Sequence, residues 1–249
     1  MILFSYARSL LSWLLIALST IFWGTLSILS VPVSPGGELS HLCMRRWGQT
    51  ILLACGIRVK TTGIENVSAG EVQIFASNHQ SFFDVWVLCA VLPVRFGWII
   101  KKELMKIPFL GAHMRINGYI TIDRSDRERA IASMDQAAEQ IRQGRRITIF
   151  PEGTRSRDGN LGPLKKGLFH LCLKTGVPLV PIFIEGTGNT LKPDSLLITP
   201  GTIRVAFGTP LATSGYTEER LDSLIEDYLS SMETLRRRID VETPGADAA

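Results

Sequence analysis

From residue 58 onwards, short runs rich in β-branched residues alternate with longer amphipathic stretches. This alternation predicts an α/β domain with a largely parallel or mixed central sheet flanked by helices. Helical patterns indicate helices at residues 125–144, 163–176 and 217–238. The predicted strands cover residues 72–77, 94–100, 119–122, 146–150, 177–184 and 202–207.

The N-terminal region differs from the rest in being free of charge over a long stretch. Residues 10–30 form 21 uncharged positions, and a helix of that length spans about 30 Å, the thickness of a bilayer core. A signal peptide would have an apolar region of only about 7–15 residues and a small-residue cleavage site. The sequence "SVPVS" at 30–34 is a poor site, which favours an uncleaved membrane anchor.

A second apolar segment at residues 41–57 has two interpretations. It mixes Arg45 and Arg46 with Trp47, and it either lies in the membrane interface with the tryptophan near the head groups or forms an ordinary core helix. We predict a hydrophobic membrane-anchoring region over 1–57. The α/β domain follows over 58–240, and a disordered tail over 241–249.

The composition narrows the classes of partner. Of the 249 residues, 45% are hydrophobic and 20% charged, so the chain can bury a substantial core. A net charge of +4 and a pI near 9.0 suit a membrane surface or a phosphorylated substrate. No arginine-rich block with interleaved aromatics is present, so nucleic acid is not an expected partner.

The cysteines and histidines argue for a reducing compartment and against a metal site. No cysteine pair has C-x-x-C spacing, and each cysteine lies in an apolar segment, which favours buried free thiols in the cytosol. No two histidines have H-x-x-x-H spacing, so no metal is expected.

Polar motifs follow several predicted strands directly. "NHQSFFD" follows residues 72–77, "DR" follows 119–122, and "PEGTRS" follows 146–150. In open α/β sheets, ligands bind beyond the carboxyl ends of the strands. These clusters are therefore expected to converge if their strands are neighbours.

The first cluster contains His79 and Asp84. Within one continuous helix, residues five apart point about 140° away from each other, so the pair requires His79 in a loop and a helix that begins near Ser81. The carboxylate would then fix the imidazole tautomer and support a general base. The alternative is a structural pair. His79 could instead activate Ser81 as a nucleophile, but the sequence around Ser81 does not have the G-x-S-x-G pattern that usually presents such a serine.

The second cluster is "FPEGTRS". Gly153 allows the backbone to approach a ligand, Thr154 offers a hydroxyl, and Arg155 can hold a phosphate with two hydrogen bonds. Glu152 either accepts from a substrate hydroxyl or holds the arginine. The alternative is a polar turn with a local ion pair.

Further cations follow other predicted strands. Arg124 either joins the same anion site or leads into a helix cap. Lys101 and Lys102 also end a predicted strand, and they either add positive charge or extend toward the membrane surface.

These motifs together resemble the glycerolipid acyltransferase family, in particular its bacterial 1-acylglycerol-3-phosphate acyltransferases. The family's H-x-x-x-x-D motif matches His79 to Asp84, and "GYITIDR" at 118–124 resembles its second block. Its E-G-T-R core matches residues 152–155, and its V-P-x-x-P pattern matches "VPLVP" at 177–181. The four blocks occur in order over roughly residues 60–210.

The resemblance implies transfer of a fatty acyl group from acyl-CoA or acyl-carrier protein. The acceptor would be the sn-2 hydroxyl of 1-acylglycerol 3-phosphate (lysophosphatidic acid), and the product phosphatidic acid. His79 would be the general base and Asp84 its orienting partner. Arg124, Arg155 and Lys102 would bind the phosphate. Glu152, Gly153 and Thr154 would belong to the acceptor site, and "VPLVP" would lie along the acyl or acceptor pocket.

The thioester is already activated, so no cofactor and no acyl-enzyme are expected. The resemblance also implies a membrane location, in bacteria the inner membrane, with the active site facing the cytoplasm. Three alternatives remain: a different acceptor, such as glycerol 3-phosphate or another lysolipid; a non-catalytic lipid-binding membrane protein; and a hydrolase that uses Ser81.

Overall fold

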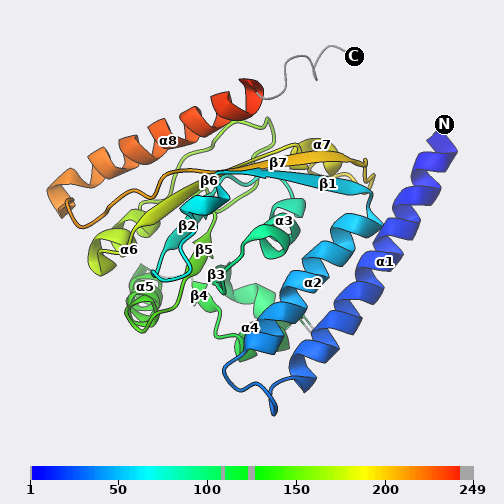
Figure 1. Cartoon of the computed structure of the whole chain (residues 1–249), viewed down its shortest axis with the longest axis horizontal. Helices are drawn as coiled ribbons and strands as arrows, with labels where there is room; N and C mark the ends of the chain where they lie inside the picture. The colour runs from blue at the N-terminus through cyan, green and yellow to red at the C-terminus, as the bar shows by residue number, and fades with distance from the viewer. Residues whose placement is uncertain (1, 108–109, 123–126, 242–249) are drawn as a thin grey trace.

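A single seven-stranded sheet in the order β1-β7-β6-β2-β5-β3-β4 forms the centre of the protein (Figure 1). The structure is a computed structural model that describes residues 2–107, 110–122 and 127–241. The strands are β1 (Ile57–Thr62), β2 (Ile74–Ser77), β3 (Gly97–Lys101), β4 (Ile120–Ile122), β5 (Ile147–Ile149), β6 (Leu179–Glu185) and β7 (Gly201–Phe207). The helices are α1 (Ile2–Leu29), α2 (Glu38–Ala54), α3 (Phe83–Val91), α4 (Leu110–Ile116), α5 (Arg127–Arg142), α6 (Gly167–Thr175), α7 (Thr187–Thr190) and α8 (Leu221–Val241), with 3-10 turns at Ile64–Asn66, Lys102–Lys106 and Glu218–Arg220.

The sheet is mixed, as the alternation predicts. Each adjacent pair in the series β6-β2-β5-β3-β4 is parallel, whereas β7 pairs antiparallel with β6 and parallel with β1. All six predicted strands are present within a few residues of the expected ranges. Strand β1 was not predicted, because "IRVKTT" is an edge strand with only one fully buried residue and so carries a weak hydrophobic signal.

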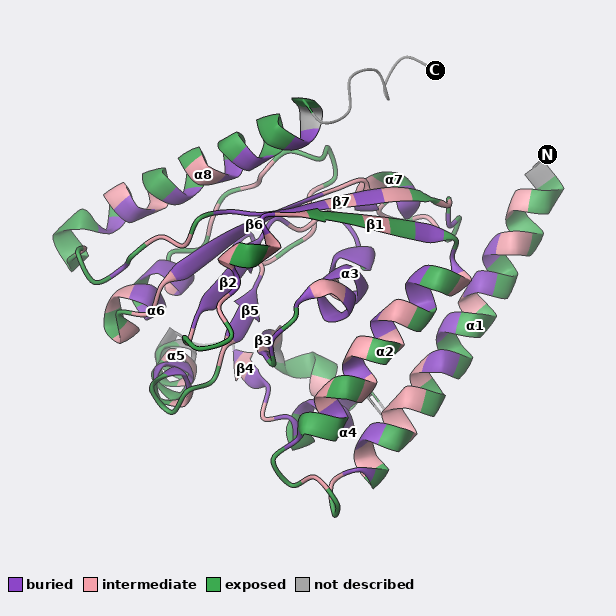
Figure 2. Cartoon of the chain, in the orientation of Figure 1, coloured by how far each residue is buried: buried purple, intermediate pink, exposed green. Residues whose placement is uncertain are grey.

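The two faces of the sheet bury separate cores, because successive strand residues point to opposite sides. In β2, Phe75 belongs to the core beneath α2 and α3, whereas Ile74 and Ala76 belong to the core beneath α5, α6 and α8. Figure 2 shows the central strands almost wholly buried between these helical layers. The polar segments that follow the strands therefore emerge at the ends of the sheet.

The predicted helices are present, and most of their apolar positions are buried. Helix α5 lies within the predicted 125–144 range, and Ala138 and Ile141 are buried as the periodicity predicts, but Ile131 is exposed. The start of the predicted range, residues 125 and 126, lies outside the described residues. Helix α8 reaches Val241, and the remainder of the predicted tail, 242–249, is also outside them.

Helix α1 has its polar side inside and its apolar side outside. Its buried positions include Ser9, Ser12, Ser19 and Ser27, which allow close approach to the rest of the protein. The segment Leu3–Leu29 is long and apolar enough to cross a membrane. Its exposed apolar side chains are Leu3, Phe4, Leu10, Leu11, Leu14, Leu15, Leu18, Ile21, Phe22, Leu26 and Leu29.

Helix α2 packs in the core on one side and exposes an apolar residue on the other. Met44, Ile51 and Leu52 are buried in the core above the sheet, whereas Leu53 is 82% exposed. Trp47 points inward, and its indole N–H donates to Thr20 Oγ1 over 3.0 Å rather than lying at the outer surface. The N-terminal helices thus share the core of the α/β domain.

Candidate active site

Three neighbouring parallel strands place the polar motifs at one edge of the sheet. Strand β2 lies between β5 and β6, so the carboxyl ends of the three strands are adjacent. His79 follows β2, and Glu152 follows β5. The predicted convergence of these two motifs is present in the structure.

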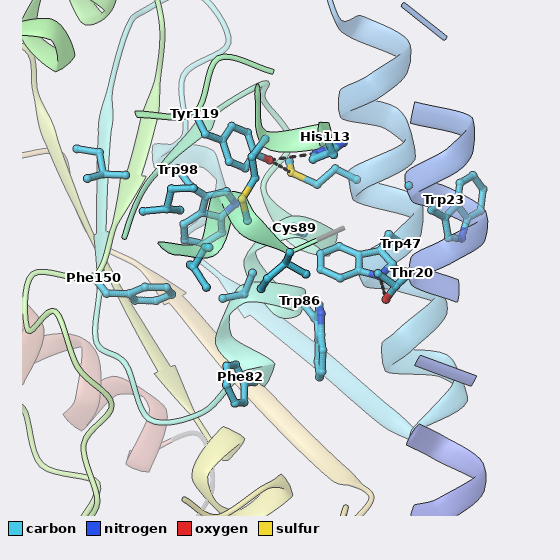
Figure 3. Close-up of a pocket in the computed structure, with 18 of the residues that line it drawn as sticks. Thr20, Trp23, Trp47, Phe82, Trp86, Cys89, Trp98, His113, Tyr119 and Phe150 are labelled. Atoms are coloured by element: carbon cyan, nitrogen blue, oxygen red, sulfur yellow. Dashed lines mark hydrogen bonds between the residues drawn. The ribbon is translucent and has the colours of Figure 1, made fainter. Parts of the chain in front are cut away.

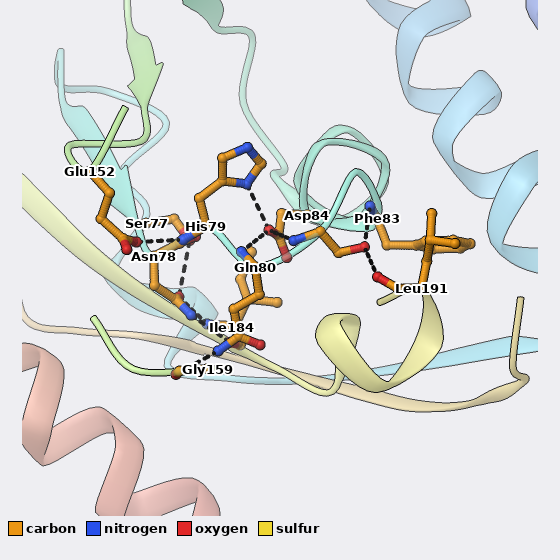
Figure 4. A network of polar contacts seen from close by, with 11 residues as sticks. Ser77, Asn78, His79, Gln80, Phe83, Asp84, Glu152, Gly159, Ile184 and Leu191 are labelled. Carbon is orange, nitrogen blue, oxygen red and sulfur yellow. Dashed lines mark hydrogen bonds and ion pairs between the residues drawn. The ribbon is translucent and has the colours of Figure 1, made fainter. Parts of the chain in front are cut away.

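His79 and Asp84 are in direct contact. The distance between His79 Nδ1 and Asp84 Oδ2 is 2.8 Å (Figure 4). Helix α3 begins at Phe83, so the histidine lies in the preceding loop and folds back over the first helical turn, as the spacing predicts. Because a carboxylate accepts hydrogen bonds, Nδ1 is the donor, and in the neutral imidazole Nε2 then carries the lone pair that can accept a proton.

The Asp84 carboxylate is fixed by hydrogen bonds from the main chain of the His79 loop. Its side chain is fully buried, and Oδ2 also accepts hydrogen bonds from the main-chain N–H groups of Gln80 at 2.7 Å and Ser81 at 2.8 Å. Among the described residues, Asp84 Oδ1 has no hydrogen-bond partner. One oxygen thus organises both the loop and the imidazole.

Aromatic stacking fixes the plane of the His79 ring. The imidazole stacks on Phe150 with 4.0 Å between ring centroids and 12° between planes, and Phe150 stacks in turn on Trp98 at 5.4 Å. The His79 side chain remains 16% exposed. The ring is therefore immobilised on one face while part of it stays accessible.

Asn78 anchors the loop to β6, a role that we did not predict. Its side-chain amide donates to Ile184 O, and its Oδ1 accepts from Ile184 N, each at 2.8 Å. These two hydrogen bonds take the place of those that a neighbouring strand would make. They give the buried N–H and C=O groups of Ile184 their partners. The signal available in the sequence was an amide residue directly before the histidine, after a buried strand.

Glu152 has two main-chain partners. Its Oε1 accepts from His79 N and its Oε2 accepts from Gly162 N, each over 2.8 Å. The residue is only 4% exposed. Burial raises the pKa of the Glu152 carboxyl, and these two N–H donors oppose part of that rise.

The other residues predicted to bind substrate differ in their exposure and in their distance from His79. Arg155 lies over the Phe82 ring, with Cζ 4.1 Å from the centroid, which places its charge beside the His79 loop. Gly153 has a φ of 73° and lines the cavity next to His79. Thr154 is exposed, and Lys102 is exposed directly after β3. Arg124 lies outside the described residues.

A cavity of about 440 Å³ opens beside His79. It runs from Phe82 and Phe150 past Cys89 and Trp98 to Tyr119, and helices α1 and α2 also contribute to its wall (Figure 3). Nearly all of the lining side chains are apolar or aromatic. The cavity suits an elongated apolar ligand, and His79 lies in its wall.

The "VPLVP" segment does not line this cavity, contrary to the interpretation of residues 177–181 as a pocket wall. Leu179, Val180 and Pro181 are buried in the first half of β6. They pack within the sheet, and none of 177–181 is among the described residues of the cavity wall.

Ser81 is not placed to act as a nucleophile. It is 1% exposed, and its hydroxyl donates to Leu191 O over 3.0 Å. The described part of the chain contains no group of three or more His, Cys, Asp or Glu side chains that could hold a metal ion.

The chain is similar in sequence to known acyltransferases. The sequence profile of the acyltransferase family matches residues 58–185, which include the His79 and Glu152 motifs. A 1-acyl-sn-glycerol-3-phosphate acyltransferase of Limnanthes douglasii is 30% identical over 232 residues, covering 91% of this chain and 80% of the relative. One of Saccharomyces cerevisiae is 31% identical over 230 residues, covering 91% of this chain and 76% of the relative.

The fold also has a crystallographic counterpart. The 1-acyl-sn-glycerophosphate acyltransferase of Thermotoga maritima superimposes with a TM-score of 0.82 at 23% identity, covering 94% of this chain and 96% of that one. Both the family profile and the relatives extend over the residues that build the site. The chain therefore belongs to the acyltransferase family.

Proposed function

We propose that this acyltransferase moves a fatty acyl group from a thioester donor to the sn-2 hydroxyl of 1-acylglycerol 3-phosphate, giving phosphatidic acid. The observation that carries the proposal is the 2.8 Å contact between His79 Nδ1 and the buried Asp84 carboxylate, at the mouth of an apolar cavity. The acyltransferase relatives carry the name of this reaction. Acyl-CoA and acyl-carrier protein are both donors of suitable chemistry.

The mechanism follows from the hydrogen bond between His79 Nδ1 and Asp84. Nε2 accepts the proton of the acceptor hydroxyl as its oxygen attacks the thioester carbonyl carbon, and the Asp84 carboxylate stabilises the imidazolium that forms. When the tetrahedral intermediate collapses, the carbon–sulfur bond breaks and Nε2 returns the proton to the thiolate. The protein supplies base, orientation and a dry site, and no covalent enzyme intermediate is needed.

The acceptor phosphate is proposed to bind beside Arg155. The guanidinium lies next to the His79 loop, and within the described residues no carboxylate lies at ion-pair distance from it. A guanidinium can hold a phosphate through two parallel hydrogen bonds. Lys102 and Arg124 follow the neighbouring strands β3 and β4, and we propose that they add positive charge to the same site.

The apolar cavity is proposed to hold an acyl chain. Aromatic and aliphatic side chains line the cavity from His79 to Tyr119, so an acyl chain would be removed from water when it binds there. The exposed leucines of α1 and Leu53 of α2 are proposed to lie in the bilayer, which would bring the cavity to the membrane surface. Four free cysteines fit a reducing cytoplasmic setting for the site, in bacteria at the inner membrane.

The direct test is an assay of the purified protein with a panel of acceptors. Lysophosphatidic acid, other lysolipids and glycerol 3-phosphate are each supplied with acyl-CoA or acyl-carrier protein, and free thiol is followed. We expect thiol release that depends on lysophosphatidic acid and a product identified by mass spectrometry as phosphatidic acid. Preference for another acceptor would reassign the substrate, and no transfer to any acceptor would overturn the proposed function.

A further inference from the structure

Glu152 joins two segments that are distant in the sequence. Its Oε1 accepts from the main-chain N–H of His79, and its Oε2 accepts from that of Gly162, both over 2.8 Å. Figure 4 shows the Glu152 carboxylate directed at the His79 main chain, whereas the imidazole ring points away toward Asp84. The carboxylate therefore holds the peptide that carries the histidine, and it does so from inside the protein.

The loop after Glu152 is attached to the same peptide a second time. The N–H of Ser156 donates to His79 O over 2.7 Å, so both main-chain groups of His79 are bonded to the segment 152–156. Arg155 lies between these two attachment points in the sequence and rests on Phe82. The spacing between the histidine and the arginine is thus fixed by this pair of bonds.

We propose that Glu152 is a positioning residue that sets His79 at the correct distance from the bound acceptor, rather than a ligand of the acceptor itself. The proposal rests on the proposed function, since it assigns the residue a part in that reaction. Its physical basis is that Glu152 is 4% exposed and that each of its oxygens already has a main-chain donor. Misplacing a reacting group by about 1 Å can cost about 100-fold in rate.

Only a carboxylate satisfies both donors. A glutamine in the same conformation has one oxygen and one NH₂ group, so the NH₂ would face either the His79 N–H or the Gly162 N–H. Two hydrogen-bond donors would then face each other in a buried site, and the loop that carries His79 or Gly162 would have to shift to separate them. Glu152→Gln therefore disturbs the position of His79 without changing any side chain that faces the cavity.

Gly162 offers a second way to perturb the same bond. A Cβ built at this position would lie 3.0 Å from Glu152 Oε2, so Gly162→Ala must push the carboxylate by a few tenths of an ångström. The φ of Gly162 is outside the left-handed region, so alanine adds no backbone strain. Gly70→Ala is a matched control, because nothing lies within 4 Å of a Cβ there.

The experiment measures steady-state kinetics of the full-length purified variants with lysophosphatidic acid and acyl-CoA. We expect Glu152→Gln to lower kcat about 10- to 100-fold and Gly162→Ala to lower it about three- to tenfold. The KM for lysophosphatidic acid should stay within about twofold in both. Glu233→Gln, at an exposed glutamate of α8, and Gly70→Ala should match the wild type.

Hydrogen exchange by mass spectrometry provides an independent measurement on the same proteins. Peptides covering residues 77–84 and 158–165 should exchange faster in Glu152→Gln than in the wild type, because the His79 and Gly162 amides lose their acceptors. If the wild type fails to acylate lysophosphatidic acid, the proposed function fails, and this exchange comparison still tests the positioning contact. Unchanged exchange would overturn the proposal.

The kinetic outcome decides between positioning and direct binding. An acceptor KM raised tenfold or more with kcat nearly unchanged would mean that Glu152 touches the acceptor, which overturns the proposal. Unchanged kcat in a folded Glu152→Gln protein would also overturn it, and where both constants change, the larger change decides. If Glu152→Gln does not fold by circular dichroism, the comparison of Gly162→Ala with Gly70→Ala decides instead.

Discussion

Asp84 Oδ2 lies 2.8 Å from His79 Nδ1 and accepts two further hydrogen bonds from main-chain N–H groups of the same loop. A single buried oxygen thus shapes the loop and selects the tautomer of the histidine. Changing the carboxylate therefore has two separable effects, one on the conformation of the loop and one on the His79 imidazole.

Replacing the carboxylate by an amide separates these effects. In Asp84→Asn, the amide oxygen can keep the bonds from Gln80 and Ser81, but the imidazole loses its anionic partner. We expect kcat to fall about 10²- to 10⁴-fold with a near-normal circular dichroism spectrum. The matched control is Asp158→Asn, at an exposed loop aspartate. Activity within tenfold of wild type would contradict the role of Asp84.

Arg155 is expected to act on acceptor binding. Because a phosphate would lose a charged partner, Arg155→Ala should raise the KM for lysophosphatidic acid about 10- to 100-fold and change the KM for acyl-CoA by less than about twofold. Initial-rate measurements with each substrate varied in turn give both constants. Arg157→Ala, two residues away and paired with exposed Asp194, should leave both constants unchanged. Equal effects of the two substitutions would argue against a specific phosphate site.

Asn78 is expected to stabilise the fold as well as the site. Asn78→Ala would leave the buried N–H and C=O of Ile184 without their partners. The free energy of unfolding should fall by about 2–4 kcal/mol. Denaturant unfolding measures this, with Asn160→Ala, at an exposed side chain, as the control. A change below about 0.5 kcal/mol would show that the two bonds are not important for stability.

The buried His113 predicts a loss of stability in acid. Burial lowers the pKa of His113 to about 4, with nearby His41 contributing less. The unfolded chain therefore takes up a proton near pH 6.5 that the folded protein resists down to about pH 4. The free energy of unfolding is therefore not reduced by this residue above pH 6.5. It falls as the pH drops from 6.5 toward 4, by at most roughly 3 kcal/mol.

Thermal unfolding between pH 7 and pH 4 measures this effect. The His113 ring contacts Ser27 Oγ at 2.6 Å and Tyr119 OH at 3.3 Å, so His113→Gln should be less stable at pH 7. It should also lose less stability on acidification than wild type. His41, whose pKa burial lowers to about 4, contributes equally in both proteins. Parallel curves for wild type and variant would contradict the assignment.

Local patterns were sufficient to predict most of the elements and the central pair. The β-branched runs correspond to six of the seven strands, and the five-residue spacing of His79 and Asp84 required the loop-then-helix arrangement that the structure has. Strand β1 carries too few buried residues for its alternation to be distinctive. These successes share one cause, which is that the relevant contacts are close in sequence.

Long-range partners could not be predicted, because they depend on strand order. Asn78 meets Ile184, 106 residues away, only because β2 and β6 are neighbours. Glu152 meets the His79 main chain only because β5 lies on the other side of β2. The interpretation of "VPLVP" as a pocket wall came from the family resemblance alone, and this segment is not part of the described cavity wall.

The sequence analysis also did not predict that the serines of α1 face the protein interior. The uncharged run from residue 10 to 30 suggested a lipid-facing helix, but hydropathy alone does not reveal that the small polar residues face the protein. The rotation of a helix about its axis is set by its neighbours, here α2 and α4.

The most direct test of the account is the acyl transfer rate of purified His79→Ala. The imidazole is the only group assigned to remove the hydroxyl proton, so we expect the rate with lysophosphatidic acid and acyl-CoA to fall about 10²- to 10⁴-fold. His170→Ala, at an exposed histidine paired with Glu218, should retain wild-type activity. A folded His79→Ala protein that transfers the acyl group within a few-fold of the wild-type rate would contradict the general-base mechanism.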